Sequence, residues 1–416
     1  MDSMDQTDFA KKFTADSGIL KLMDDLGKAM AGGDIKYMFG GGNPANIPEV
    51  NVRFDGLLKE IASTGQLSTE ALHNYDTPQG NAKFIKALVS FLNDEYGWNV
   101  SEKNIAITPG SQTGFFILFN LLSDKQRHIQ LPLVPEYIGY LDQAIHNGAF
   151  KAAKPAIVKT GSHQFKYQVD FEGLEVTDDT AALCLSRPTN PTGNVVTEEE
   201  LEKLQSLADE KEIPLIIDCA YGDPFPGIVR QPTQMTWTKN RIITLSLSKI
   251  GLPGARTGII IAPEEIASAV TKANAIIALA NPNIGQLLME PLLRSGEVKQ
   301  LITDKIQPFY MDKADFARQT IEEVFDDSLP YYLHEHEGSF FFWLWLEDLP
   351  IPTKELYQRL KQRGVLVVPG EYFFTDVGKD WKHQYECLRL NIARPKKEVT
   401  EGMTILAEEI ANSYRR

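Results

Sequence analysis

Residues 241–262, RIITLSLSKIGLPGARTGIIIA, place two apolar runs on either side of a polar turn. Both runs are short and rich in isoleucine, which is typical of buried strands, and the Pro-Gly turn between them is brief. Ser246, Ser248 and Lys249 end the first run, and Arg256 precedes the second. The stretch predicts two neighbouring strands with hydroxyls and positive charge gathered at one end.

The chain upstream of this stretch alternates apolar runs with helical patterns. Strands are predicted at NIAIT (104–108), AALCLS (181–186) and IPLIIDCAY (213–221), and helices follow the first two at 113–122 and 197–211. The second helix opens with Thr197 and Glu200 at the spacing of a capping box. Strands that alternate with helices indicate an α/β fold with a mostly parallel sheet.

The pattern changes near residue 300. Beyond about residue 283 it is helical, and it then becomes alternating and aromatic in GSFFFWLWLEDL and GVLVVPGEYFF, which predict strands of a second, smaller α+β unit. Leu20, Met23 and Leu26 lie at helical spacing in the amino-terminal stretch. We therefore predict an N-terminal segment (1–45) that packs on the small domain, a large domain (46–300) and a small C-terminal domain (301–416).

Charge and composition limit the partners of this chain. Its formal net charge is 42 minus 56, or −14, which opposes nonspecific binding to nucleic acid or to an anionic membrane. No apolar run reaches the ~18 residues of a membrane span, and the amino terminus carries acids where a secretory signal needs an apolar run. Cys184, Cys219 and Cys387 have no paired or metal-like spacing, which favours buried thiols in a reducing cytoplasm.

Polar residues follow several of the predicted strands. In an open parallel sheet, ligands bind beyond the carboxyl ends of the strands. Gly110, Ser111 and Gln112 open a helix whose N–H groups can hold a phosphate, and Arg256 can bind one bidentately. Asn190 follows the strand at 181–186.

Asp218 and Tyr221 lie toward the end of the strand predicted at 213–221, and a buried carboxylate there needs a partner. Each feature alone is compatible with a plain turn, a buried amide or a solvated lysine. Together, a phosphate cradle, an amine, a carboxylate, a phenol and an amide fit pyridoxal 5'-phosphate, an aldehyde cofactor that Lys249 would bind covalently.

NPTG, DCAY and SLSKIGLPGARTG occur in the order and approximate spacing of the fold type I pyridoxal-phosphate aminotransferases of class I/II, which the chain resembles over nearly its whole length. NYDTPQG, ITPGSQTGFFILFNLL and LRLNIA extend the match. The stretches GGGNPANIPE, PEYIGY and AYGDPFPGI resemble members that exchange an amino group between L-valine and pyruvate by a ping-pong mechanism. The resemblance implies a homodimer acting on small amino acids and 2-oxo acids.

The resemblance also implies roles for individual residues. Lys249, Asp218 and Tyr221 would be catalytic: Lys249 moves the proton, Asp218 faces the pyridine nitrogen, and Tyr221 with Asn190 bonds the ring oxygen. Tyr137 would stack on the ring. The phosphate would be held by Ser111, Gln112, Ser246, Ser248 and Arg256, and by Tyr75 from the other subunit. Gly42, Asn190 and Arg389 would bind the substrate, with Arg389 on its α-carboxylate.

Three points stay open at this stage. His334 and His336 in HEHEG lack convincing further ligands, so we predict a solvated connection and no metal site. Arg187 and Arg294 are the arginines that could add a cation to the substrate pocket. A pyridoxal-phosphate C–S β-lyase would share the cofactor residues. The effector domain of an aminotransferase-like transcription regulator would need a preceding DNA-binding domain, for which the stretch before GGGNP at residue 40 is too short.

Overall fold

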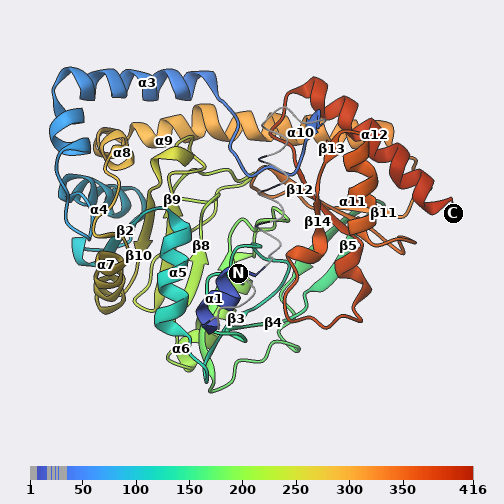
Figure 1. The fold of residues 1–416 in the computed structure, drawn as a ribbon, viewed down its shortest axis with the longest axis horizontal. Helices are drawn as coiled ribbons and strands as arrows, with labels where there is room; N and C mark the ends of the chain where they lie inside the picture. Colours follow the sequence, from blue (N-terminus) through green and yellow to red (C-terminus); the bar gives the residue numbers. More distant parts are fainter. Residues whose placement is uncertain (1–6, 16–19, 21–23, 25–26, 28–34, 416) are drawn as a thin grey trace.

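The computed structural model describes residues 7–15, 20, 24, 27 and 35–415, and it contains two main sheets flanked by helices (Figure 1). The seven-stranded sheet has the order β2-β10-β9-β8-β7-β3-β4. Its strands are β2 (Ile105–Thr108), β3 (His128–Leu131), β4 (Phe150–Ala152), β7 (Thr180–Ser186), β8 (Leu215–Asp218), β9 (Arg241–Ser246) and β10 (Gly258–Ile261). Only β10 runs antiparallel to its neighbours in this sheet, so the predicted α/β fold with a mostly parallel sheet is confirmed.

Helices cover this sheet, which explains why strands β2, β7, β8, β9 and β10 contain continuous apolar runs rather than alternating ones. The helices are α3 (Pro48–Ser63), α4 (Ala82–Tyr96), α5 (Ser111–Leu122), α6 (Glu198–Glu210), α7 (Glu264–Ala278) and α8 (Ile284–Ser295). Helix α5 packs on β2, β9 and β10, and α6 packs on β7 and β8. The predicted capping box of α6 is present: the Thr197 hydroxyl accepts from the Glu200 N–H, and the Glu200 carboxylate accepts from the Thr197 N–H.

The second sheet has six strands in the order β14-β15-β12-β11-β6-β5. These are β5 (Ala156–Gly161), β6 (Gln164–Gln168), β11 (Tyr331–His334), β12 (Phe341–Leu346), β14 (Val368–Pro369) and β15 (Cys387–Asn391). Helices α10 (Gln307–Val324), α11 (Thr353–Gln362) and α12 (Lys396–Tyr414) lie with it (Figure 1). Strand β6 pairs in parallel with β11, so a hairpin from the middle of the chain extends a sheet built mostly from its last third.

Two segments connect the parts of the molecule. Helix α9 (Glu297–Leu301), a π-helical stretch (Ile302–Ile306) and α10 follow one another without a loop, and they run from one sheet toward the other (Figure 1). Near the amino terminus, β1 (Tyr37–Met38) pairs with β13 (Val365–Leu366).

The amino-terminal segment contacts both units. Helix α1 (Asp8–Phe13) lies against the large unit, where Phe13 meets Phe116 of α5 edge to face and the Lys12 amine donates to the His146 carbonyl. The helical pattern predicted around Leu20, Met23 and Leu26 falls largely outside the described residues. Among the helices described, none is long and apolar enough to cross a membrane. The three cysteines are free and buried, as predicted.

Candidate active site

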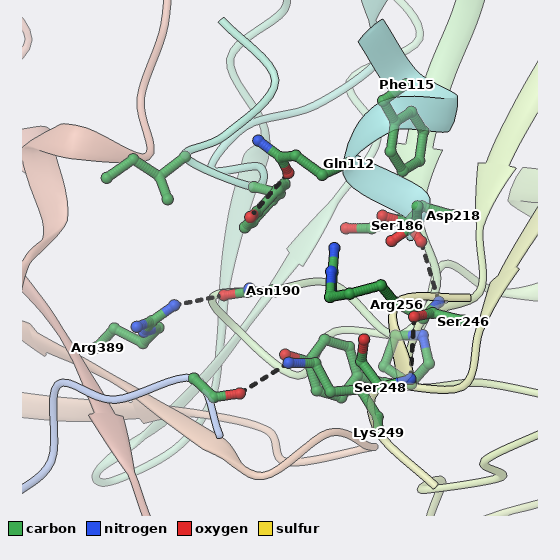
Figure 2. Close-up of a pocket in the computed structure, with 17 residues that line it drawn as sticks. Gln112, Phe115, Ser186, Asn190, Asp218, Ser246, Ser248, Lys249, Arg256 and Arg389 are labelled. Atoms are coloured by element: carbon green, nitrogen blue, oxygen red, sulfur yellow. Dashed lines mark hydrogen bonds between the residues drawn. The ribbon is translucent and has the colours of Figure 1, made fainter. Parts of the chain in front are cut away.

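A cavity of about 210 Å³ lies beyond the carboxyl ends of β7, β8 and β9 (Figure 2). The residues that line it include every predicted site residue except Tyr75: Gly42, Ser111, Gln112, Tyr137, Asn190, Asp218, Tyr221, Ser246, Ser248, Lys249, Arg256 and Arg389. Figure 2 shows Arg389 and Asn190 on one side of the cavity and Arg256 with Ser246 on the other. Strand register places Ser186, Asp218 and Thr244 side by side at this edge of the sheet.

The first helix after β2 forms an anion cradle. Helix α5 begins at Ser111 and has no side-chain cap, so its first N–H groups and the positive end of its dipole face the cavity. Gly110 has φ +85°, and a Cβ there would lie 2.1 Å from a guanidinium nitrogen of Arg256. A Cβ on Gly258 would lie 2.4 Å from the Ser111 nitrogen. The two glycines thus let Arg256 and the backbone approach closely enough to surround one small anion.

Arg256 itself has φ +47°, which is uncommon for a residue with a side chain. Beside it, the Ser246 hydroxyl accepts from the Ser248 N–H at 3.1 Å. Both serine side chains line the cavity. The turn after β9 therefore delivers hydroxyls and a guanidinium to one place, as its sequence predicts.

Asp218 ends β8 and is buried, and both of its oxygens are held. Oδ2 accepts from the Tyr140 hydroxyl at 2.8 Å, and Oδ1 accepts from the Ala220 N–H at 3.0 Å and the Thr244 hydroxyl at 3.3 Å. Burial raises the pKa of Asp218, whereas these hydrogen bonds and the nearby Lys249 cation oppose that rise. The site thus supports a carboxylate inside the protein.

Lys249 points into the cavity, and its amine donates to the Gly42 carbonyl at 2.7 Å. The amine lies 5.5 Å from the centre of the Tyr221 ring. Burial, together with repulsion from Arg389 and Arg256, lowers its pKa from 10.5 to about 8. Near neutral pH a usable fraction of this amine is therefore unprotonated.

Arg389 comes from β15 of the second sheet, so both units contribute to the cavity. Its guanidinium donates to the Asn190 side-chain oxygen and to the Gly40 carbonyl, each at 2.9 Å. It also lies 4.2 Å from the centre of the Phe341 ring. Burial lowers its pKa to about 10.

Its buried Nε finds no hydrogen-bond acceptor in the part of the chain that the structure describes. Leaving a buried donor unpaired costs about 1–3 kcal/mol, so this atom favours a ligand that brings an acceptor.

Two tyrosines of the predicted set lie in different surroundings. The Tyr137 hydroxyl donates to the Gln112 side-chain oxygen at 3.3 Å, which links two lining residues. Tyr75 is 83% exposed and does not reach the cavity of its own chain.

Four polar residues at or near the cavity are missed at the sequence level: Glu136, Tyr140, Ser186 and Thr244. Buried Glu136 accepts from the Ser186 N–H at 2.7 Å and from the Ser186 hydroxyl at 2.5 Å, and burial raises its pKa to about 8. In PEYIGY, the two tyrosines three residues apart are the signal that could have drawn attention to Tyr140.

The prediction that HEHEG is a solvated connection is wrong. His334 and His336 are each 3% exposed, and their ring nitrogens bond to backbone: His334 accepts from the Tyr167 N–H, and His336 contacts the Ser339 carbonyl. Burial lowers the pKa of each to about 3. The two residues are neutral core side chains, because β11 and the loop after it lie between packed layers. Among the described residues, no group of three or more metal-ligating side chains occurs.

The two arginines left open lie outside the cavity. Arg187 is fully buried and turns away, where it donates to the Val196 carbonyl and pairs with Glu198 at 2.8 Å. Arg294 pairs with Glu290 on the exposed face of α8.

Comparison with known proteins agrees with this geometry. The family model for aminotransferase class I and II matches residues 46–406, and the chain belongs to this family. Fold and site therefore define a fold type I aminotransferase, an enzyme.

Within the family, the chain is 44% identical over 412 residues to the valine–pyruvate aminotransferase of Escherichia coli (strain K12), covering 98% of each. The solved valine–pyruvate aminotransferase AvtA of Salmonella typhimurium LT2 superposes with a TM-score of 0.89 at 43% identity, covering 96% of this chain and all of that one. A solved structure from Psychrobacter arcticum 273-4 gives a TM-score of 0.95 at 41% identity, with full coverage of both chains.

Proposed function

We propose that this enzyme binds pyridoxal 5'-phosphate and exchanges an amino group between L-valine and pyruvate, giving 2-oxoisovalerate and L-alanine. The observation that carries the proposal is that one cavity brings together the Lys249 amine, the buried Asp218 carboxylate and the guanidinium groups of Arg256 and Arg389. The 44% identity to a valine–pyruvate aminotransferase supports the choice of substrates.

The donor set fits this cofactor. The uncapped end of α5, Ser246, Ser248 and Arg256 suit a phosphate dianion, and Gly110 and Gly258 leave room for it. Tyr137 would stack on the ring, while Asn190 and Tyr221 would bond its oxygen. When bound, pyridoxal 5'-phosphate supplies an electron-accepting ring that stabilises negative charge at the substrate α-carbon.

Lys249 and Asp218 would divide the proton chemistry. Lys249, with a pKa of about 8, is the amine in the cavity that can take a proton from the substrate α-carbon and return it. Asp218, whose carboxyl oxygens accept from three donors that favour its ionised form, would keep a proton at the ring nitrogen. One group thus moves a proton, and the other holds one in place.

Arg389 would bind the substrate carboxylate. Its Nε is buried without an acceptor, and a guanidinium can hold a carboxylate by two parallel hydrogen bonds. Its contacts with the Phe341 and Phe373 rings fix the plane of the group.

Charge in the cavity favours apolar donors. The cations that line it in the described chain are Lys249, Arg256 and Arg389, and each has a part in binding the cofactor or the α-carboxylate. Arg187 and Arg294 are paired elsewhere in the chain. A donor with a second carboxylate would find no free cation of this chain, whereas valine needs none.

We also propose a homodimer, because an apolar patch lies on the surface beside Tyr75. The patch comprises Leu72, Tyr75, Ile276, Ile277 and Leu279, which are 51% to 88% exposed. Hydrogen bonds hold its two segments together: Asn283 donates to the Glu70 carbonyl, and Asn281 to the Pro78 carbonyl. A second copy would cover this patch, and Tyr75 would reach the phosphate in the partner's cavity. The three free, buried thiols suit the cytoplasm as its location.

A half-reaction tests the proposed activity. L-valine added alone should change the absorbance of the bound cofactor, and pyruvate should restore it with release of alanine. Borohydride should fix the cofactor irreversibly, and peptide mapping should locate it at Lys249.

Faster reaction with aspartate or glutamate would refute the donor assignment and leave the cofactor assignment standing. Release of pyruvate and ammonia from cysteine or cystathionine, faster than any amino transfer, would indicate a β-lyase instead.

A further inference from the structure

Tyr140 lies behind the cavity and is 1% exposed, yet it touches three residues that line the cavity: Asp218, Tyr137 and Phe115. Its hydroxyl donates to Asp218 Oδ2 at 2.8 Å. Its ring meets the Tyr137 ring edge to face, with centroids 5.4 Å apart.

The position of the Tyr140 hydroxyl is fixed by packing. Its ring also contacts Phe115 at 5.0 Å and Phe119 at 5.5 Å, so aromatic side chains enclose it. Burial raises the pKa of Tyr140 well above 10, and the phenol therefore keeps its proton and remains a donor. Asp218 Oδ1 accepts from Ala220 and Thr244, whereas Oδ2 accepts from Tyr140. Tyr140 therefore fixes the oxygen that the other two donors do not contact.

We propose that Tyr140 is a positioning residue, whose hydroxyl orients the Asp218 carboxylate and keeps it ionised where it would meet the ring nitrogen of the cofactor. The inference rests on the proposed function, since it needs the cofactor in this cavity. It assigns a role to a side chain that touches neither cofactor nor substrate.

Other titratable groups act on Asp218 as well. They are Lys249, Glu136, Tyr137, Tyr221, Cys184 and Cys219. Lys249 favours the carboxylate, and a negative charge on Glu136 would oppose it. Tyr140→Phe leaves all of these in place and removes one oxygen atom, so it isolates the hydrogen bond.

The test compares Tyr140→Phe with Tyr167→Phe. Tyr167 of β6 is equally buried. Its hydroxyl accepts from the indole of Trp343 on β12 at 3.0 Å and contacts His383, which lies in a short 3-10 helix. Both variants lose one buried hydroxyl, but only Tyr140→Phe loses a contact with Asp218. Thermal unfolding of both apoproteins measures the general cost of the deletion.

We expect Tyr140→Phe to bind pyridoxal 5'-phosphate about tenfold more weakly, measured by quenching of protein fluorescence. The acid limb of its kcat/KM profile for valine should move up by about one pH unit, because loss of a donor raises the pKa of Asp218. Tyr167→Phe should show neither change. In an Asp218→Asn background, Tyr140→Phe should change cofactor affinity less than twofold, since the charge it orients is gone.

Equal cofactor affinities and pH profiles for the two variants would overturn the inference. An effect of Tyr140→Phe that persists in full with Asp218→Asn would also overturn it, because the hydroxyl would then act elsewhere. Failure of the wild-type protein to bind pyridoxal 5'-phosphate would refute the proposed function itself, which is a separate result.

Discussion

Lys249 shares its cavity with two guanidinium groups, so its positive charge is disfavoured before any ligand arrives. Burial and repulsion from the two guanidinium groups both lower the pKa of Lys249, and the Asp218 carboxylate offsets this lowering only in part. The surroundings of Lys249 therefore keep part of its amine unprotonated at neutral pH, and the same effect lowers the free energy of unfolding.

That cost predicts a pH-dependent effect of Lys249→Met on the apoprotein. The pKa of Lys249 is about 8 in the folded state and 10.5 ordinarily, so between these values the unfolded chain binds the proton more tightly and stability rises with pH. Below pH 8 the full penalty applies, at most about 3 kcal/mol.

Lys249→Met should therefore be more stable than wild type at pH 7, with the difference narrowing from pH 8 to 10.5 in urea unfolding. Lys203→Met removes a lysine on the exposed face of α6 and serves as the control. A stability difference independent of pH would contradict the account.

Arg389 gives the second prediction at this scale. Arg389→Ala should raise KM for every amino and 2-oxo acid alike, because all of them share the α-carboxylate. A lost charge-assisted contact of about 2–4 kcal/mol corresponds to roughly 30- to 1,000-fold. Steady-state kinetics with valine, alanine and pyruvate measure it, and Arg230→Ala, whose guanidinium pairs with Asp315 outside the cavity, is the control. An increase in KM for one substrate alone would mean that Arg389 contacts the substrate side chain and not the α-carboxylate.

Residues at strand ends can be predicted from the sequence, and those behind them cannot. Asp218 and Lys249 each follow an apolar run and Arg256 precedes one, and the strand topology then brings all three to one edge of the sheet. Tyr140 bonds to Asp218 across 78 positions of the chain, a contact that no local pattern encodes. The prediction of a solvated connection at HEHEG was wrong for the same reason, because the residues that bury the two histidines come from distant parts of the chain.

At the scale of elements, the junction of β2 and α5 decides whether an anion can bind. Gly110→Ala would place a methyl group against the Arg256 guanidinium at a backbone conformation, φ +85°, that alanine disfavours. We expect cofactor affinity to fall at least tenfold and stability to fall by about 1–2 kcal/mol.

Gly97→Ala is a matched control for this change. Gly97 caps α4 with φ +64°, and no atom lies within 4 Å of the Cβ it would gain. It should lose similar stability and keep its cofactor affinity, measured by fluorescence titration. Equal affinities in the two variants would show that the close approach at Gly110 is unnecessary for binding.

Strands β2, β7, β8, β9 and β10 of the first sheet were predictable because each is buried on both faces and contains an apolar run. Strands β3 and β4 were not predicted, since HIQL and FKA alternate apolar with polar residues. The hairpin of β5 and β6 was not predicted, since β5 is largely exposed and its composition carries no such signal. Its place in the second sheet depends on β11, whose Leu333 pairs with Gln164 from far along the chain.

At the scale of the whole molecule, the exposed apolar patch predicts the oligomeric state. Ile276→Lys should yield monomers, because an unpaired lysine within a covered apolar surface costs several kcal/mol. Light scattering coupled to size-exclusion chromatography measures the mass. Val158→Lys, at an exposed position on β5, should leave the mass unchanged. A monomeric wild-type protein, or a dimeric Ile276→Lys variant, would contradict the proposed interface.

The pairing of β6 with β11 also means that β6 is synthesised well before its partner strand. Strand β6 ends at residue 168 and β11 ends at residue 334, so 334 − 168 = 166 residues must still be translated before the pair can close. At ~5–20 residues per second this takes roughly 10–30 s. During that interval the hairpin of β5 and β6 has an unpaired strand edge while the chain is still on the ribosome. An unpaired edge can pair with the wrong strand, so we expect chaperone binding to matter most at this stage.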